Sequence, residues 1–320
     1  MKISRRSFIS YTTAFAAAPA LFGQDAPKVV DQPGFLARFL GCGASGWKKE
    51  WGKNPHMRRQ SSLMLDNAAV FDFTMCSFDK LPSGLKPEAL FVTHSHKDHF
   101  NPEATVKLGV KHVFVQSSWL NYAKSVIHEA ATAAKLACPE VTGLEFAKPV
   151  EIAGMKVTQV PSMHSTSRLT DGVLERTSMY LVEKGASRLL YATDTGGISG
   201  DAARMMGIDL HINKKKYTTK DTLHQNPYVH EPMPLTAFIM EATNGDDDEN
   251  FRLFVHSSVQ NVDRIVKCLK KTNRFAPPSG QKAILTHLGL KYRGWSSEKI
   301  EKEISPELAA AYDGWEVRIG

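Results

Sequence analysis

The sequence has few cysteines and lacks any long apolar run beyond its N-terminus. Only four of its 320 residues are cysteine, and none of them forms a CxxC pair, which excludes a disulfide-dense miniprotein or a cysteine-rich zinc finger. No later stretch approaches the roughly 18 apolar residues of a membrane helix, so we expect no membrane span in the mature chain. Cys42, Cys76, Cys138 and Cys268 are expected to be buried thiols, with a disulfide as the alternative.

Positive charge is also modest. The formal net charge is +7, and removing Lys2, Arg5 and Arg6 with the N-terminal segment would leave +4. Neither an aromatic nucleic-acid motif nor a recognition-helix pattern accompanies this charge. We therefore expect a small-molecule substrate and no specific nucleic-acid partner.

Residues 1–23 have the pattern of an export signal. Ser4 to Ile9 read Ser-Arg-Arg-Ser-Phe-Ile, an apolar alanine-rich stretch follows, and Ala18 and Ala20 offer small residues for cleavage. The run resembles the twin-arginine signal, which implies the twin-arginine export machinery as a partner and a periplasmic or otherwise exported protein. A frayed basic helix is the alternative.

From Gly34 onward, short apolar runs alternate with longer amphipathic stretches, which predicts a mixed α/β fold. The expected strands are 90–92, 112–115, 156–160, 179–182, 189–192, 237–240 and 283–285, and the expected helices are 105–109 and 119–136. A polar, lysine-rich stretch at 213–234 is expected to be an inserted loop. The acidic run at 246–249 is expected to be a solvated loop tip, because it lacks the ligand spacing of a calcium loop.

Four side chains able to bind a metal fall within six residues, directly after the strand expected at 90–92: His94, His96, Asp98 and His99. In an extended backbone, residues two apart face the same way, so His94 and His96 can converge on one ion. Asp98 and His99 lie where the chain turns toward a helix and can face a second ion. The segment predicts a metal site, with a surface cluster as the alternative.

This HxHxDH run resembles the signature of the metallo-β-lactamase superfamily. Residues similar to the superfamily's later motifs follow in its order: a His after a strand at 160–164, a strand and Asp at 190–196, a strand and His at 285–287, and a closing strand at 312–317. The resemblance implies a four-layer αββα sandwich over residues 35–320.

The resemblance also implies a dinuclear metal site. One metal would be held by His94, His96 and His164, the other by Asp98, His99 and His287, and Asp194 would bridge them. Imidazole and carboxylate ligands without thiolate suit two divalent ions. Zn²⁺ is the favoured metal, and Mn²⁺ or Fe is the alternative. A hydroxide shared by two such ions would attack the substrate, so hydrolysis is the implied reaction.

Further motifs are similar to those of one branch of the superfamily. The segments 39–45 and 58–62 resemble the opening of the tRNase Z group and of the phosphodiesterase from the carbon–phosphorus lyase pathway. Met-Glu-Ala-Thr at 240–243 and His-Ser-Ser at 256–258 look like paired motifs of the tRNase Z group. By this resemblance, Glu241 would orient His256, which would help to protonate the leaving oxygen.

The expected function is hydrolysis of a phosphodiester or cyclic phosphate ester, with Asp98, His256 and Glu241 taking part in catalysis. A lactonase or other ester hydrolase on the same scaffold is an alternative. Another is a metal-binding accessory protein without turnover. A homodimer is left open.

Overall fold

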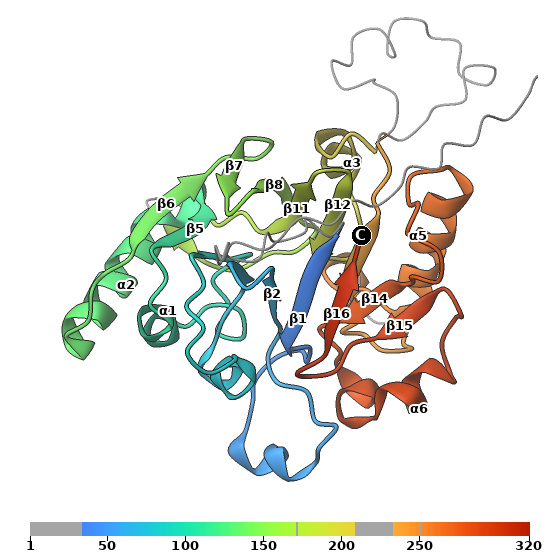
Figure 1. Cartoon of the computed structure of the whole chain (residues 1–320), viewed down its shortest axis with the longest axis horizontal. Coiled ribbons are helices and arrows are strands. Elements are labelled where there is room, and N and C mark those ends of the chain that lie inside the picture. Colours follow the sequence, from blue (N-terminus) through green and yellow to red (C-terminus); the bar gives the residue numbers. More distant parts are fainter. Residues whose placement is uncertain (1–33, 171, 209–232, 250) are drawn as a thin grey trace, which may run out of the picture. The chain divides into compact units, whose positions relative to one another are not determined.

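Two seven-stranded mixed β-sheets organise the chain in a computed structural model, which describes residues 34–170, 172–208, 233–249 and 251–320 (Figure 1). The first sheet has the order β16-β1-β2-β3-β4-β5-β6, with strands β1 (Phe35–Gly41), β2 (Ser62–Leu65), β3 (Ala69–Phe71), β4 (Ala89–Phe91), β5 (His112–Gln116), β6 (Glu140–Leu144) and β16 (Glu316–Ile319). The second has the order β15-β14-β13-β12-β11-β8-β7, with strands β7 (Pro149–Ile152), β8 (Met155–Pro161), β11 (Ser178–Lys184), β12 (Ser187–Ala192), β13 (Ala237–Glu241), β14 (Ala283–Thr286) and β15 (Leu308–Ala310).

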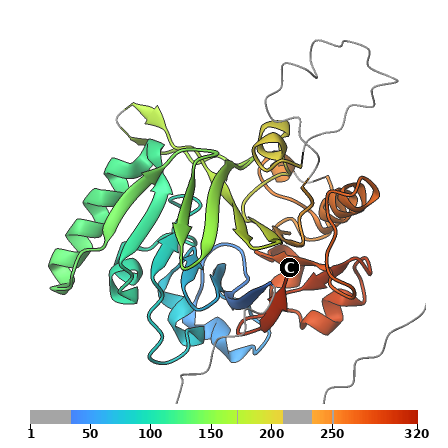
Figure 2. The ribbon, with the colours of Figure 1, turned by 45° about the horizontal axis from the view of Figure 1, so that its top comes forward.

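Helices cover the outer face of each sheet. Helices α1 (Pro102–Leu108) and α2 (Leu120–Ala134) pack on the first sheet, and α3 (Gly200–Met205), α5 (Val259–Lys271) and α6 (Ser297–Glu301) pack on the second. Figure 2 shows the two groups of helices on opposite sides of the strands. A small hairpin, β9 (Leu169–Thr170) and β10 (Val173–Leu174), stands apart from both sheets. The four-layer αββα sandwich expected from the sequence is confirmed.

Side chains alternate between the two buried faces of each sheet. In β12, Leu189 and Tyr191 pack in the core between the sheets, whereas Leu190 and Ala192 pack against the helices. Since strand residues two apart share a face, a strand buried on both sides appears in the sequence as an unbroken apolar run. This is why each predicted strand corresponds to a real one, namely β4, β5, β8, β11, β12, β13 and β14, although the strand predicted at 90–92 runs one residue past the end of β4.

Both predicted helices are also present, although their bounds differ. The predicted helix 119–136 corresponds to α2, and the predicted helix 105–109 corresponds to α1, which begins earlier, at Pro102. The earlier start has a local cause: the Asn101 side chain accepts a hydrogen bond from Ala104 N, and proline suits the first turn of a helix.

All four cysteines are free thiols, but the expectation that they are buried is wrong for two of them. Cys42 is buried and Cys76 is partly buried. Cys138 is exposed in the loop after α2, and Cys268 is exposed on α5, whose apolar face packs on the sheet.

The acidic run 246–249 lies in an exposed turn, as expected, where Asp246 pairs with Lys291. The export signal predicted at 1–23 and nearly all of the loop predicted at 213–234 lie outside the described residues. Among the helices that the structure describes, none combines the length and the apolarity needed to cross a membrane.

Candidate metal centre

Polar side chains gather where parallel strands of both sheets end. Strands β12, β13 and β14 run parallel, and Asp194, Glu241 and His287 lie at or just past their carboxyl ends. Strands β3 and β4 are also parallel, and Asp72 and His94 follow them. Because the carboxyl ends of parallel strands meet at one edge of a sheet, the topology concentrates these side chains in one place.

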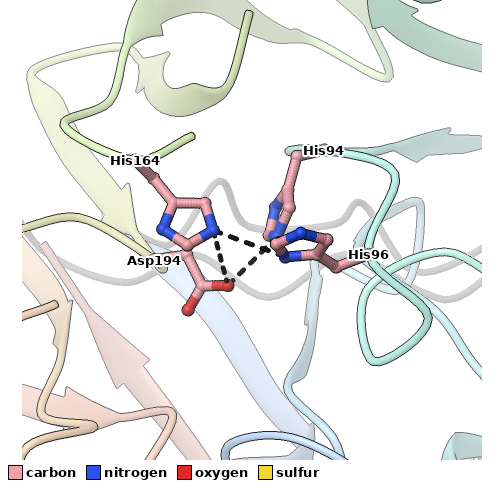
Figure 3. A group of neighbouring side chains, drawn as sticks. All are labelled: His94, His96, His164 and Asp194. Carbon is pink, nitrogen blue, oxygen red and sulfur yellow. Dashed lines mark hydrogen bonds and ion pairs between the residues drawn. The ribbon is translucent and has the colours of Figure 1, made fainter. Parts of the chain in front are cut away.

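The first group of candidate ligands consists of His94, His96, His164 and Asp194, whose ligand atoms all lie within 4.8 Å of one another. Figure 3 shows the three imidazoles and the carboxylate pointing toward a common point. His94 Nε2 is 2.9 Å from His96 Nδ1 and 3.1 Å from Asp194 Oδ2. His164 Nε2 is 3.4 Å from His96 Nδ1 and 3.8 Å from Asp194 Oδ2.

The second group consists of Asp98, His99 and His287. His99 Nε2 lies 3.1 Å from His287 Nε2, and Asp98 Oδ2 lies 3.7 and 3.5 Å from these two nitrogens. Asp194 Oδ2 is 3.1 Å from His99 Nε2, the same distance that separates it from His94 Nε2. One carboxylate oxygen therefore lies between the two groups, where a bridging ligand is expected.

The donor atoms fit divalent metal ions. Tetrahedral zinc with bonds of about 2.0–2.1 Å places its ligand atoms about 3.4 Å apart, and the separations above bracket that value. Asp194 Oδ1 is buried and takes part in no hydrogen bond within the described structure. Nitrogen and oxygen donors without thiolate suit Zn²⁺, Mn²⁺ or Fe. The structure thus brings the seven predicted ligands together in two groups that could hold metal ions.

The three imidazoles of the first group are in the protonation state that metal binding requires. Burial lowers the pKa of His94 and of His96, and it lowers the pKa of His164 to about 4. These rings are therefore neutral at pH 7, which is the state in which a histidine nitrogen binds a metal.

The carboxylates of the site are ionised despite their burial. Burial alone would raise the pKa of Asp194, but the His287 and His99 imidazoles outweigh it and hold that pKa well below its ordinary range. The pKa of Asp98 is also lowered, because the His99 and His287 imidazoles outweigh the effect of burial, which alone would raise it. Burial opposes a charge on His99, yet Asp194 and Asp72 raise its pKa well above the ordinary value. The carboxylates therefore attract positive charge to the site.

Outer hydrogen bonds fix the orientation of four of the candidate ligands, a feature that also tunes metal sites. The pairs are His94 Nδ1 with Thr93 Oγ1 (3.0 Å), His99 Nδ1 with Asp72 Oδ2 (2.8 Å), His164 Nδ1 with Val255 O (3.1 Å) and His287 Nδ1 with Thr243 Oγ1 (2.7 Å). None of these partners was predicted from the sequence. One feature of the sequence could have indicated Asp72: it is a single acidic residue between Phe71 and Phe73, directly after a buried strand.

The predicted pair of Glu241 and His256 also forms. Glu241 is fully buried, and backbone N–H groups of Thr195 and Thr243 donate to its two oxygens, each at 2.8 Å. His256 Nδ1 lies 2.9 Å from Glu241 Oε1 and 3.6 Å from Asp194 Oδ1. Burial opposes protonation of His256, but Glu241 outweighs it and raises the pKa. This arrangement leaves Nε2 as the ring nitrogen free to exchange a proton with a substrate.

A helix–sheet–sheet–helix sandwich with imidazole and carboxylate ligands at one edge is the architecture of a metal-dependent hydrolase. A model of the beta-lactamase superfamily domain matches residues 69–287, more than half of the chain, so the chain belongs to this superfamily. No curated protein matches the sequence.

Solved structures resemble the chain at low sequence identity. They include a diphosphatase from the PhnP family (16% identity, 88% of this chain and 96% of that chain covered, TM-score 0.54), the short form of human tRNase Z (14%, 89% and 99%, 0.56) and Zn²⁺-bound PqqB from Methylobacterium extorquens (15%, 88% and 99%, 0.54). At these identities the likeness concerns the fold.

Proposed function

We propose that the protein is an exported hydrolase that cleaves a phosphodiester or cyclic phosphate ester. It would use two divalent metal ions, for which Zn²⁺ is the preferred candidate. The observation that carries this proposal is the buried Glu241 carboxylate, which holds His256 next to Asp194. An alkoxide is a poor leaving group, and its departure gains most from a nearby proton donor. A paired imidazole at the metal centre suits such a substrate.

Each residue has a distinct task in this reaction. Two ions held by the ligand groups would supply Lewis acidity toward the phosphate oxygens and a hydrolytic nucleophile at neutral pH. Asp194 spans the two groups, and Asp98 contributes a carboxylate to the second. Glu241 accepts the Nδ1 proton of His256, which fixes the ring and favours its protonated form. His256 Nε2 then donates its proton to the leaving oxygen.

The test of His256 compares two leaving groups. In His256→Ala, hydrolysis of a dinucleoside phosphate, whose leaving group is an alkoxide, should lose about 100-fold in kcat, the scale of general acid catalysis. Hydrolysis of thymidine 5′-(p-nitrophenyl phosphate) should lose far less, because p-nitrophenolate departs without a proton. His128→Ala, at an exposed position on α2, is the control. Equal losses on both substrates would show that His256 is not the acid.

The substrate class is tested by assaying the metal-loaded protein against phosphodiesters, lactones, thioesters and β-lactams. Phosphodiester turnover is the expected result. Turnover of lactones alone would replace the phosphodiester proposal with the lactonase alternative. Bound metals without turnover of any class would indicate an accessory protein.

Export by the twin-arginine route is supported by the Ser-Arg-Arg-Ser-Phe-Ile run at residues 4–9. Fractionation of expressing cells should find the mature protein outside the cytoplasm. A protein that stays uncleaved in the cytoplasmic fraction of a host with this machinery would overturn that part of the proposal.

A further inference from the structure

A side pocket opens next to the metal centre. Its volume is about 380 Å³, and its lining residues are Ser95, His96, Thr166, Ser167, Arg168 and Leu169. His96 belongs to the first group of metal ligands, so a molecule bound at the metals can extend into this pocket. The other lining residues take no part in the proposed reaction, and they supply hydroxyl groups and one positive charge.

A buried carboxylate lies behind the lining of this pocket and holds two of its residues in place. The Glu175 side chain has no exposed surface, and it accepts hydrogen bonds from Ser95 N at 2.7 Å, from Ser95 Oγ at 2.5 Å and from Thr166 Oγ1 at 2.9 Å. Ser95 stands between the ligands His94 and His96 in the chain. Glu175 therefore ties the segment after the β9–β10 hairpin to the metal-binding loop.

The same network holds Arg168 in one orientation. Arg168 Nε donates to Ser95 Oγ at 2.8 Å and lies 3.6 Å from Glu175 Oε2. Its guanidinium carbon lies over the Tyr122 ring, 3.8 Å from the ring centre, which is a cation–π contact. The side chain is still 34% exposed, and neither Nη1 nor Nη2 donates a hydrogen bond to any of the described residues. A guanidinium fixed in this way loses little freedom when it binds an oxyanion.

We propose that Arg168 binds a second anionic group of the substrate in the pocket beside His96. The inference rests on the proposed function and narrows its substrate class to phosphodiesters that carry another oxyanion, such as a phosphate, near the scissile bond. A planar guanidinium matches an oxyanion through paired N–H···O bonds, whereas the metals engage the scissile group itself. Arg168 is thus a specificity-determining residue.

Two chromogenic substrates test this inference. Thymidine 5′-(p-nitrophenyl phosphate) carries one anionic group, and its 3′-phosphorylated analogue carries a second, while both release p-nitrophenolate. Arg168→Gln should lower kcat/KM for the 3′-phosphorylated substrate about tenfold, the effect of one partly exposed charge-assisted hydrogen bond. The loss should appear in KM, because binding and not the chemical step is weakened. The unphosphorylated substrate should change by less than about twofold.

The chain offers a matched control. Arg176 is exposed and lies over the Phe146 ring, with its guanidinium carbon 4.8 Å from the ring centre, but it does not line the pocket. Arg176→Gln makes the same change of charge and should leave both substrates unaffected. Arg168→Lys keeps the charge without the planar group, so its loss should be smaller, about threefold.

A binding measurement separates this inference from the proposed function. Thymidine 3′,5′-bisphosphate should bind the metal-loaded protein more tightly than thymidine 5′-monophosphate, and Arg168→Gln should remove that preference. If the wild-type protein hydrolyses neither diester but shows this preference, the phosphodiesterase proposal fails and the role of Arg168 stands. If Arg168→Gln weakens both nucleotides equally, or neither, Arg168 does not recognise the second anion and its role is structural.

Discussion

Asp72 acts on the metal centre through His99. Its Oδ2 lies 2.8 Å from His99 Nδ1, and its Oδ1 accepts the backbone N–H of Thr93 at 2.8 Å. In Asp72→Asn the negative charge that favours the metal-binding orientation of His99 is lost. We expect the affinity of the second ligand group for metal to fall by about 10- to 100-fold. Competition with a chromophoric zinc chelator measures this change.

The control for this variant is Asp79→Asn. Asp79 is an exposed partner of Arg59 and makes the same carboxylate-to-amide change away from the metal ligands. It should bind metal as the wild-type protein does. Unchanged zinc affinity in Asp72→Asn would show that its hydrogen bond to His99 does not tune the site.

His164 should make the stability of the metal-free protein depend on pH. Burial lowers its pKa from 6.5 to about 4, so between these values the unfolded chain binds a proton that the folded protein does not. The stabilisation is present above pH 6.5 and is lost as the pH falls toward 4. From pH 7.5 to pH 5, the free energy of unfolding should fall by about 1–2 kcal/mol more in the wild-type protein than in His164→Gln.

Urea unfolding of both proteins at the two pH values measures this difference. His128→Gln, at an exposed position on α2, should show the wild-type pH dependence. An equal loss of stability in the wild-type protein and in His164→Gln would contradict a lowered pKa at His164.

The clustering of the candidate ligands could be predicted from the sequence, but most of their supporting partners could not. Four ligands fall within six residues, and the other three each follow an apolar strand run, so local pattern reveals them. The supporting contacts are long-range: Asp72 is 27 residues from His99, and Thr243 is 44 residues from His287. Spacing in the sequence carries no information about such contacts, because they depend on how the strands are arranged.

At the scale of elements, most strands buried on both faces were predicted, but β1 and β2 were missed although both are internal, and most edge strands were missed as well. β6 and β7 lie at sheet edges and have only two and one fully buried positions respectively, and β15 has only three residues. Such strands show neither an unbroken apolar run nor a long alternation. β3, also of three residues, is internal but too short to be distinguished from a loop.

Arg58 connects elements that are distant in the sequence. Its side chain is buried and donates to the carbonyl oxygens of Ala311 at 2.8 Å and Tyr292 at 3.0 Å and to Ser297 Oγ at 3.0 Å. Tyr292 and Ser297 lie in the segment that follows the ligand His287, and Ala311 lies directly after β15. In Arg58→Met the acceptors would stay buried without a donor, so we expect a loss of about 3 kcal/mol in the free energy of unfolding.

Chemical denaturation of the Arg58→Met protein measures this loss. Arg204→Met is the comparison, because the Arg204 side chain is 41% exposed and pairs with Asp201 on the same helix. It should change stability by less than about 0.5 kcal/mol. If both variants are equally stable, the Arg58 network does not hold these elements together.

At the scale of the whole molecule, the candidate metal centre takes its residues from both sheets. His94, His96, Asp98 and His99 follow β4 of the first sheet, whereas His164, Asp194 and His287 follow strands of the second. Each ligand group contains residues from both sides. An ion bound to either group therefore links the sheets, in addition to the apolar core that packs between them.

Removal of the metals should consequently weaken the whole sandwich. A ligand present at about 1,000 times its dissociation constant stabilises a fold by about 4 kcal/mol, which for a domain of this size corresponds to about 10 °C in Tm. We expect a chelator to lower the calorimetric Tm by that amount and added Zn²⁺ to restore it. In His287→Ala, which removes a ligand of the second group and leaves the first group intact, the chelator should lower the Tm by less than it does in the wild-type protein. An identical Tm with and without chelator in the wild-type protein would mean that no metal links the sheets.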